Sequence, residues 1–322
     1  MNIDDIVSWI VFPLLQYPVL VYIVFWTPSV KITLLLILYS VLLKVCISLC
    51  SKYKCQGSLP WKSLAEIESA IVLVTGGSHG LGRSIIMELL NRYKNIKVIN
   101  LDLQQSPRTD IRIMDIQCDL KDTVALSYCI NQIKIRYGSR LSLIVNNAGI
   151  RAPYQYLKDS NELIIQDVFA VNVFAPIKII RELVPLQHQC YVINIASTLG
   201  ILAPVKVSTY AASKAALIAF HNSFSLELEM LGVSQTRSLL VLSGQLDTRM
   251  FGGFEPPLKF FAPVVNKQKL ACNLIDCCER GQSGEICVPL YSNFAHVLMA
   301  LPLFPRNLLR KLSKMDDCLP QE

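Results

Sequence analysis

The chain has little of what a metal centre or a disulfide framework requires. Its four histidines are scattered, and none of its eleven cysteines belongs to a Cys-x-x-Cys pair. Zinc sites need closely spaced cysteine and histidine ligands, so we expect no bound metal. Cys118 and Cys190 instead fall in or beside strand-like apolar stretches, where free cysteine acts as a small buried side chain.

Three further patterns are missing: an internal repeat, a low-complexity tract, and a basic stripe interleaved with aromatic residues. The last absence argues against nucleic-acid binding, because that function needs clustered cations. The formal net charge of +7 suits the phosphates of a cofactor or an anionic membrane surface instead. A length of 322 residues fits one α/β domain with an appendage.

Charge is also scarce in the first 50 residues. Residues 6–26 carry no charged side chain and residues 32–50 carry only Lys44. Each run has about 20 residues, enough to cross a hydrocarbon core about 30 Å thick. A turn at 27–29 leaves two spans, a re-entrant hairpin or a single span open, and a buried amphipathic helix is the alternative without a membrane. The lysines at 52, 54 and 62 place the flank that follows on the cytoplasmic side.

Past residue 69, short apolar runs alternate with helical stretches. This alternation predicts an α/β fold, a Rossmann-type, doubly wound parallel sheet of about seven strands. The predicted strands cover residues 71–75, 97–101, 115–119, 141–146, 189–196, 236–243 and 284–289. Ligands of such sheets bind outside the carboxyl ends of the strands, so the residues after each strand are candidates for a site.

The first predicted strand ends in Thr75-Gly76-Gly77-Ser78-His79-Gly80-Leu81-Gly82 and leads into a helical stretch. Strand, glycine-rich turn and helix, in that order, are the setting of a dinucleotide-binding turn. Its glycines let the backbone turn sharply and approach a pyrophosphate, whose charge the N-terminus of the helix favours. The expected cofactor contacts here are Gly76, Ser78, His79, Gly80, Leu81 and Gly82.

The second predicted strand is followed by Asp102, whose carboxylate can accept hydrogen bonds from an adenosine ribose and would repel a 2′-phosphate. This favours NAD over NADP. Asn100 is an alternative ribose partner, and Arg83 is available to a 2′-phosphate, so NADP stays open. Asp119 and Leu120, at the end of the third strand, are expected to flank the adenine.

The fourth predicted strand ends in Asn146-Asn147-Ala148-Gly149, and the fifth ends just before Ser197. Parallel strands bring both ends to the edge that holds Gly76. We expect Asn146, Ala148 and Gly149 to contact the cofactor. Asn172 lies in an otherwise apolar helical stretch, where a buried amide must find partners. It is either a satisfied structural amide or the holder of a water in a proton path.

Tyr210 and Lys214 are four residues apart in a predicted helix over 209–231, so both side chains project from one face. An ammonium beside a phenol favours the phenolate and lowers the pKa of the phenol. A phenol tuned in this way can exchange a proton with an alcohol or a carbonyl. Taken alone, such a pair is more often a solvated helix contact; the segments described above favour the chemical interpretation.

Together these motifs resemble the short-chain dehydrogenase/reductase family, in its single-domain branch, over residues 69–290. The resemblance implies that Tyr210 is the general acid/base and that Ser197 orients the substrate oxygen. It implies that Lys214 holds the nicotinamide ribose and lowers the pKa of the tyrosine, so that Tyr210 and Lys214 also contact the cofactor. It further implies that Asn172 supports a water relay. A homodimer is one assembly that this prediction leaves open.

The resemblance has one departure. The family usually carries Pro-Gly before the segment that covers the nicotinamide, with a threonine a few residues later, whereas this chain has Ser243-Gly244-Gln245-Leu246-Asp247-Thr248. Gly244 and Thr248 remain expected cofactor contacts. Because proline fixes φ and serine does not, we expect a less rigid turn.

The segments after Thr248 are similar to those of membrane-bound members that act on retinoids, steroids or other lipid alcohols, and of a fungal membrane oxidoreductase. We therefore expect a membrane anchor at 1–50, a linker at 51–68, the NAD(P)-binding catalytic domain at 69–290, and a tail at 291–322 that lies on the membrane or packs on the domain. Residues 249–265 are expected to form a mobile substrate lid.

The function we expect is hydride transfer between NAD(P) and an alcohol or carbonyl group of a lipid-like substrate. The catalytic domain would face the cytosol, at the endoplasmic reticulum or a lipid droplet. The alternatives are an NADPH-dependent keto-lipid reductase and a catalytically silent, membrane-bound nucleotide-binding scaffold.

Overall fold

The computed structural model describes residues 2–17, 30–54, 60–107, 110–185, 187–252 and 255–320. Its centre is one parallel sheet of seven strands in the order β3-β2-β1-β4-β5-β6-β7. The strands are β1 (Ala70–Thr75), β2 (Ile96–Asp102), β3 (Ile113–Gln117), β4 (Leu141–Asn146), β5 (Cys190–Ile195), β6 (Thr236–Ser243) and β7 (Gly284–Val288). This sheet confirms the predicted doubly wound fold. The prediction succeeded because continuous apolar runs are typical of parallel strands buried on both faces.

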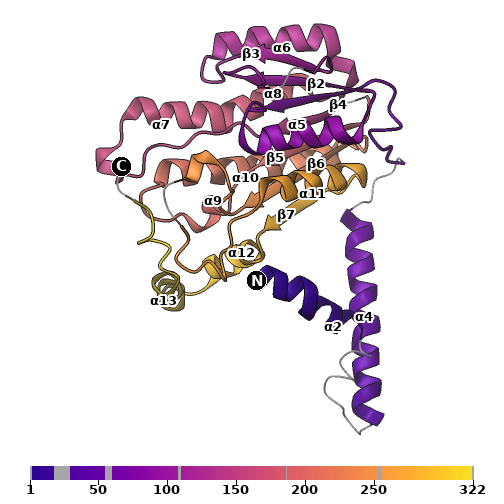
Figure 1. Cartoon of the computed structure of the whole chain (residues 1–322), viewed down its shortest axis with the longest axis vertical. Helices are drawn as coiled ribbons and strands as arrows, with labels where there is room; N and C mark the ends of the chain where they lie inside the picture. The colour runs from indigo at the N-terminus through magenta and orange to yellow at the C-terminus, as the bar shows by residue number, and fades with distance from the viewer. Residues whose placement is uncertain are drawn as a thin grey trace.

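Helices cover both faces of the sheet (Figure 1). One face packs against α5 (Gly80–Arg92) and α11 (Lys267–Glu279), and the other against α6 (Thr123–Tyr137), α8 (Ala175–Leu183) and α10 (Ser208–Met230). The shorter elements are η2 (Gly138–Arg140), η3 (Leu157–Asp159), α7 (Glu162–Phe169), η4 (Ala170–Phe174), α9 (Leu199–Leu202), η5 (Arg249–Phe251), η6 (Leu290–Phe294), α12 (Ala295–Ala300) and α13 (Leu303–Ser313).

The order of the strands creates a crevice between β1 and β4. From β1 the chain moves outward to β2 and β3, then returns to pair β4 on the other side of β1. The connections after these two neighbouring strands therefore leave in opposite directions. Such a switch point opens a ligand site at the carboxyl ends of the strands. The predicted glycine-rich turn and Asn146 both lie there.

The N-terminal segment is helical where it is described. It comprises α1 (Ile3–Ile6), η1 (Val7–Val11) and α2 (Phe12–Gln16), followed by α4 (Val30–Lys54), which extends away from the sheet in Figure 1. Many apolar side chains of α4 are exposed, among them Leu34, Leu35 and Leu38. The predicted turn at 27–29 lies outside the described residues, so the number of spans stays a prediction.

A second apolar helical run belongs to the domain itself. Of the residues that the structure describes, only the continuous run Glu162–Leu183 has both the length and the apolarity of a membrane span. Core helices meet the same criteria, and this run packs Val171, Ala175 and Ile179 into the hydrophobic core. It is therefore a core element and carries no argument for a membrane. The apolar part of α4, Ile37–Cys50, is shorter.

The residues just before the sheet differ from the predicted linker. The Trp61 indole donates a hydrogen bond to the Cys278 carbonyl oxygen at 2.8 Å and packs edge-on against Tyr191, with ring centroids 5.8 Å apart. Leu64 is buried in the core cluster under α5 and α11. Packing with the domain therefore begins ahead of the predicted boundary at residue 69, and the described residues 51–54 still belong to α4.

The C-terminal tail packs on the domain at its end and exposes apolar side chains before it. Leu319 is buried in a cluster with Tyr210 and Phe251. Leu303 and Phe304 of α13 are largely exposed. Of the two predicted arrangements, packing on the domain is thus present, and contact with a membrane stays a prediction.

Candidate active site

The glycine-rich turn leaves no room for side chains at its base. Gly76 has a φ of +68°, and a Cβ there would lie 2.9 Å from the Ala148 Cα. A Cβ on Gly82 would lie 2.2 Å from the Gly76 carbonyl oxygen. The Asn147 amide donates to the carbonyl oxygens of Thr75 and Gly76, each at 3.0 Å. Glycine is required at these positions, and Asn147, quoted in the motif but given no cofactor role, braces the turn from β4.

The turn presents backbone N–H groups at the start of α5, the arrangement that binds a diphosphate. Gly80, Leu81 and Gly82 form the first turn of this helix, with His79 as its N-cap. Leu81 and Ser78 bury their side chains, so a cofactor contact from either would be made by the backbone. Thr248 lies close by, because a Cβ on Gly80 would be 3.4 Å from the Thr248 methyl carbon.

The end of β2 braces the same turn. The Asp102 carboxylate accepts a hydrogen bond from the Ser78 amide at 2.9 Å. Asn100 accepts one from the Gly77 amide at 3.0 Å and donates to the Ser78 hydroxyl and to Asp115. Because Asn100 is fully buried and bonded inside the turn, the alternative of Asn100 as ribose partner is wrong. Asp102 keeps the predicted place at the tip of β2.

The structure brings the four predicted catalytic residues together. Ser197 follows β5, and Tyr210 and Lys214 lie on α10, all of them buried. The Ser197 side chain lies close enough to the Tyr210 phenol to lower its pKa. The Lys214 ammonium lies 5.8 Å from the centre of the tyrosine ring and donates to the Ile195 carbonyl oxygen at 2.8 Å. The predicted helix over 209–231 differs from α10 by one residue at each end, and it places both side chains on one face as expected.

Without a cofactor, burial has a larger effect than Lys214 on the pKa of the Tyr210 phenol. Burial raises the pKa of Tyr210 above its ordinary value, and the nearby Ser197 side chain lowers it by a smaller amount. Burial also lowers the pKa of Lys214 to about 8. The expectation that Lys214 depresses the pKa of the phenol is therefore not met in the protein alone, because desolvation disfavours both charged forms. Tyr210 is a protonated donor at neutral pH.

Asn172 is a satisfied structural amide. It lies in η4, a π-helical turn, and is fully buried. Its oxygen accepts from the Ile150 amide at 2.8 Å, and its nitrogen donates to the Ile150 carbonyl oxygen at 2.8 Å and to the Ser213 hydroxyl at 2.9 Å. A Cβ on Gly149 would be 3.3 Å from this oxygen and 3.4 Å from the Lys214 nitrogen. Asn172 thus lies beside the lysine, while the water relay stays a prediction.

Two of the predicted cofactor contacts, Asn146 and Leu120, have buried side chains, and a third, Asp119, is partly exposed. The Asn146 amide donates to Asn194 at 2.8 Å, and Asn194 in turn bonds His221. A contact from residue 146 to the cofactor would therefore come from its backbone. Leu120 is buried in the core, whereas Asp119 is partly exposed at the edge. The sequence did not predict the pair Asn194 and His221. Asn194 lies in β5 and His221 in α10, and no local pattern indicates that these two side chains meet.

Gly244 lies where β6 ends beside Ser197. The Ser197 hydroxyl donates to the Ser243 carbonyl oxygen at 3.2 Å. A Cβ on Gly244 would lie 2.5 Å from the Tyr291 phenol oxygen, so only glycine fits. Tyr291 was not predicted as a site residue, because its place on this wall depends on the fold of the C-terminal segments.

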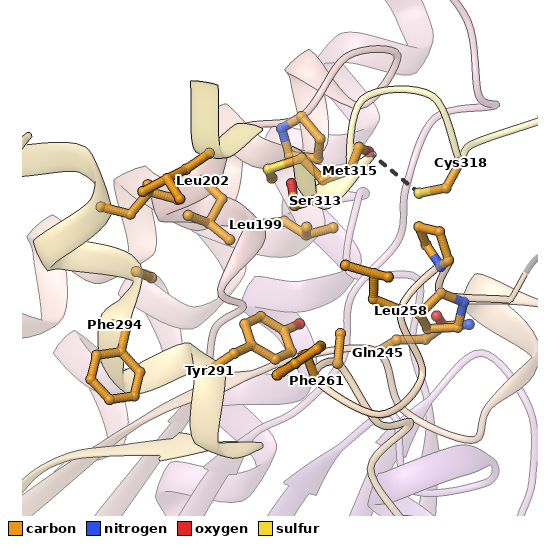
Figure 2. Close-up of a pocket in the computed structure, with 18 of the residues that line it drawn as sticks. Leu199, Leu202, Gln245, Leu258, Phe261, Tyr291, Phe294, Ser313, Met315 and Cys318 are labelled. Atoms are coloured by element: carbon orange, nitrogen blue, oxygen red, sulfur yellow. Dashed lines mark hydrogen bonds between the residues drawn. The ribbon is translucent and has the colours of Figure 1, made fainter. Parts of the chain in front are cut away.

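An apolar cavity of about 460 Å³ opens from Ser197 and Gly244 (Figure 2). It lies between residues 256–263, η6 with α12, and the C-terminal tail. Its walls are mostly aliphatic and aromatic side chains, including Leu199, Leu202, Phe251, Leu258, Phe261, Tyr291, Phe294, Leu298 and Leu319. Cavities of this kind bury apolar ligands and use a few polar groups to orient them. The Tyr210 side chain adjoins the cavity through its cluster with Phe251 and Leu319.

A family model described as short chain dehydrogenase matches residues 70–256. The chain belongs to the short-chain dehydrogenase family. It is therefore an oxidoreductase of the kind that uses a nicotinamide cofactor, and the glycine cradle above α5 fits the diphosphate of such a cofactor.

Among its relatives, the uncharacterized oxidoreductase TDA5 of Saccharomyces cerevisiae is 45% identical over 326 residues, covering 100% of both chains. The 17-beta-hydroxysteroid dehydrogenase 13 of Rattus norvegicus is 24% identical over 264 residues, covering 78% of this chain and 85% of that one. A short chain dehydrogenase from Burkholderia cenocepacia in complex with NADP has the same fold, with a TM-score of 0.63 and 22% identity over 76% of this chain and 98% of that chain.

Proposed function

We propose that this short-chain dehydrogenase interconverts an alcohol and a carbonyl group on a hydrophobic, lipid-like substrate. The observation that carries the proposal is the apolar cavity of about 460 Å³ that starts at Ser197 and Gly244. A polar substrate would leave most of its groups without hydrogen-bond partners against such walls, whereas an apolar one is stabilised by burial.

The proton step follows from the geometry of the site. A carbonyl oxygen within reach of the Ser197 hydroxyl and the protonated Tyr210 phenol would accept a hydrogen bond from Ser197 and a proton from Tyr210. A nicotinamide cofactor, when bound, would supply or accept the hydride. In the oxidative direction Tyr210 must take a proton from the alcohol, and a positive charge at Lys214 favours the phenolate that does so.

We propose NAD as the preferred cofactor because of the carboxylate at the tip of β2. Among the described residues, Asp102 accepts hydrogen bonds from the backbone amides of Ser78 at 2.9 Å and Gln104 at 3.2 Å and has no ion-pair partner, so its negative charge would oppose a 2′-phosphate. Solved structures with this fold contain NADH in one case and NADP in another, so the fold alone does not choose.

Asp102→Asn tests this preference, since asparagine keeps an acceptor for the Ser78 amide and removes the charge. We expect NAD to bind more weakly and the ratio of NADP to NAD affinity to rise about tenfold, the factor for about 1.4 kcal/mol. Fluorescence titration of both cofactors measures it. Tighter binding of NADPH than of NADH by the unaltered chain would instead favour the keto-lipid reductase.

Membrane attachment is part of the proposal. The exposed apolar side chains of α4 support an anchor. Lys52 and Lys54 at its end and Lys62 beyond it support a cytosolic catalytic domain, at the endoplasmic reticulum or a lipid droplet. Residues 256–263, within the predicted lid, form one wall of the cavity. A homodimer and a mobile lid remain predictions.

The deciding experiment is a substrate panel with the full-length chain in lipid nanodiscs. NADH formation would be followed with long-chain and polycyclic alcohols and, as a control, with water-soluble polyols. We expect turnover of the apolar group. Turnover of the polyols alone would refute the substrate class, and turnover of nothing, with cofactor still bound, would favour the silent scaffold.

A further inference from the structure

We propose that the first turn of the N-terminal segment is part of the substrate site, with Asp4 as a positioning residue that holds the rim of the apolar cavity. The inference deepens the proposed function and rests on it for the identity of the substrate. It gives the N-terminal segment a second role besides attachment to a membrane.

Two hydrogen bonds join α1 to the rim. The Asp4 carboxylate accepts a hydrogen bond from the Leu290 amide at 3.0 Å, across 286 positions of sequence. The Ile3 amide donates to the Phe260 carbonyl oxygen at 3.0 Å. Figure 1 shows the N-terminus next to α12, in agreement with these contacts. The two bonds therefore fasten one helical turn to two separate segments of the catalytic domain.

Both of those segments form walls of the cavity. Leu290 begins η6, whose Tyr291 and Phe294 line it. Phe260 precedes Phe261, which also lines it, and the two rings meet edge to face with centroids 5.0 Å apart. Figure 2 shows Tyr291 and Phe261 among the side chains that line the cavity. Asp4 thus acts through backbone contacts on the residues that would touch a substrate.

Burying the Asp4 carboxylate costs free energy, which a residue that served only to attach the chain to a membrane would not need to spend. One oxygen bonds Leu290, and the other is buried without a hydrogen-bond partner among the described residues. Burial raises the pKa of Tyr291 to about 12, and the negative charge of Asp4 adds to that effect, so the carboxylate lies near this wall of the cavity. An apolar membrane segment has no need of a buried carboxylate, and burying one is unfavourable unless it is bonded.

The neighbouring residue provides a contrast within the same turn. Asp5 accepts a hydrogen bond from the Asn2 amide at 3.0 Å, and Asn2 accepts one from the Asp5 amide at 2.9 Å. This reciprocal pair is a local capping box that stabilises α1 itself. Asp5 therefore maintains the helix, whereas Asp4 connects it to the cavity.

The segment that leaves this contact is apolar and exposed. Trp9 is 80% exposed and Phe12 is 49% exposed, while Phe261 and Phe294 at the rim are 53% and 58% exposed. The rim of the cavity therefore lies beside the side chains that would enter a lipid phase. A substrate dissolved in that phase would reach Tyr291 without crossing water.

Asp4→Ala, Asp4→Asn and Asp5→Ala in full-length protein in nanodiscs test the proposal. For Asp4→Ala we expect KM for an apolar alcohol to rise about fivefold, which corresponds to about 1 kcal/mol, with kcat and NAD affinity unchanged. Asp4→Asn keeps an acceptor oxygen for the Leu290 amide and should restore KM. Asp5→Ala removes the capping box but no contact with the rim, so it should raise KM less than Asp4→Ala does.

Hydrogen exchange provides a readout that needs no substrate. Asp4→Ala should speed amide exchange in 258–262 and 290–294, whereas Asp5→Ala should speed it mainly in 2–6. Unchanged exchange in both rim segments, or an Asp4→Asn protein as impaired as Asp4→Ala, would overturn the proposal. If no alcohol is turned over, the exchange result still decides the role of Asp4, and the proposed function fails separately.

Discussion

Among single residues, Tyr210 has the most direct chemical role that the site assigns. Its phenol is buried and lies near Ser197 and Lys214. Tyr210→Phe removes the exchangeable proton and little else. We expect kcat to fall by about 100-fold or more, the usual contribution of a positioned acid or base, with NAD affinity unchanged. Steady-state kinetics and a cofactor titration measure both, and Tyr156→Phe, at an exposed tyrosine, is the matched control.

His221 gives a second prediction at this scale, about stability. Burial lowers its pKa from 6.5 to about 4, and its ring nitrogen is bonded to Asn194 at 3.0 Å. The unfolded chain binds a proton between these pH values and the folded chain does not. The contribution of neutral His221, up to about 3 kcal/mol, is therefore complete above pH 6.5 and lost as the pH falls toward 4.

His221→Asn keeps an acceptor for Asn194 and removes the titration. Urea unfolding at a series of pH values should show a shallower decline in the free energy of unfolding below pH 6.5 for this variant. Equal slopes for the two proteins would mean that other groups cause the acid sensitivity.

For the elements, the junction of β1 and α5 is the most constrained. A methyl group at Gly82 would meet the Gly76 carbonyl oxygen at 2.2 Å, whereas one at Gly138 would have no neighbour closer than 3.5 Å. We expect Gly82→Ala to weaken NAD binding at least tenfold, the factor for about 1.4 kcal/mol, because the turn must shift. Gly138→Ala, at the end of α6, should bind NAD normally. Unaltered NAD affinity of Gly82→Ala would contradict the assignment of the turn.

The positions of the helices and strands were predicted most accurately from the sequence. Strand runs such as 141–146 are apolar throughout, and the helix of Tyr210 differs from the predicted one by one residue at each end. Local pattern was sufficient for these elements, because burial on both faces and helical spacing are properties of contiguous residues. The packing of Trp61 on Cys278 and Tyr191 was missed, because its partners lie more than 100 positions away.

At the scale of the whole molecule, the exposed apolar length of α4 predicts firm membrane attachment. Full-length protein should remain in the membrane fraction after an alkaline carbonate wash, because apolar side chains such as Leu34 and Leu42 are stabilised by lipid. A C-terminal tag should be digested by protease added from the cytosolic side, as the lysines after the anchor predict. Release by carbonate would contradict the anchor, and protection of the tag would contradict the orientation.

The sequence by itself determined the sheet, the glycine-rich turn and the four residues proposed as catalytic, because each depends on residues close together in the chain or on a recurring motif. Only the tertiary structure decided that Asn100 braces the turn, that burial raises the pKa of Tyr210, and that Asp4 reaches Leu290. Desolvation and long-range hydrogen bonds depend on which distant segments pack together, and no local pattern records that.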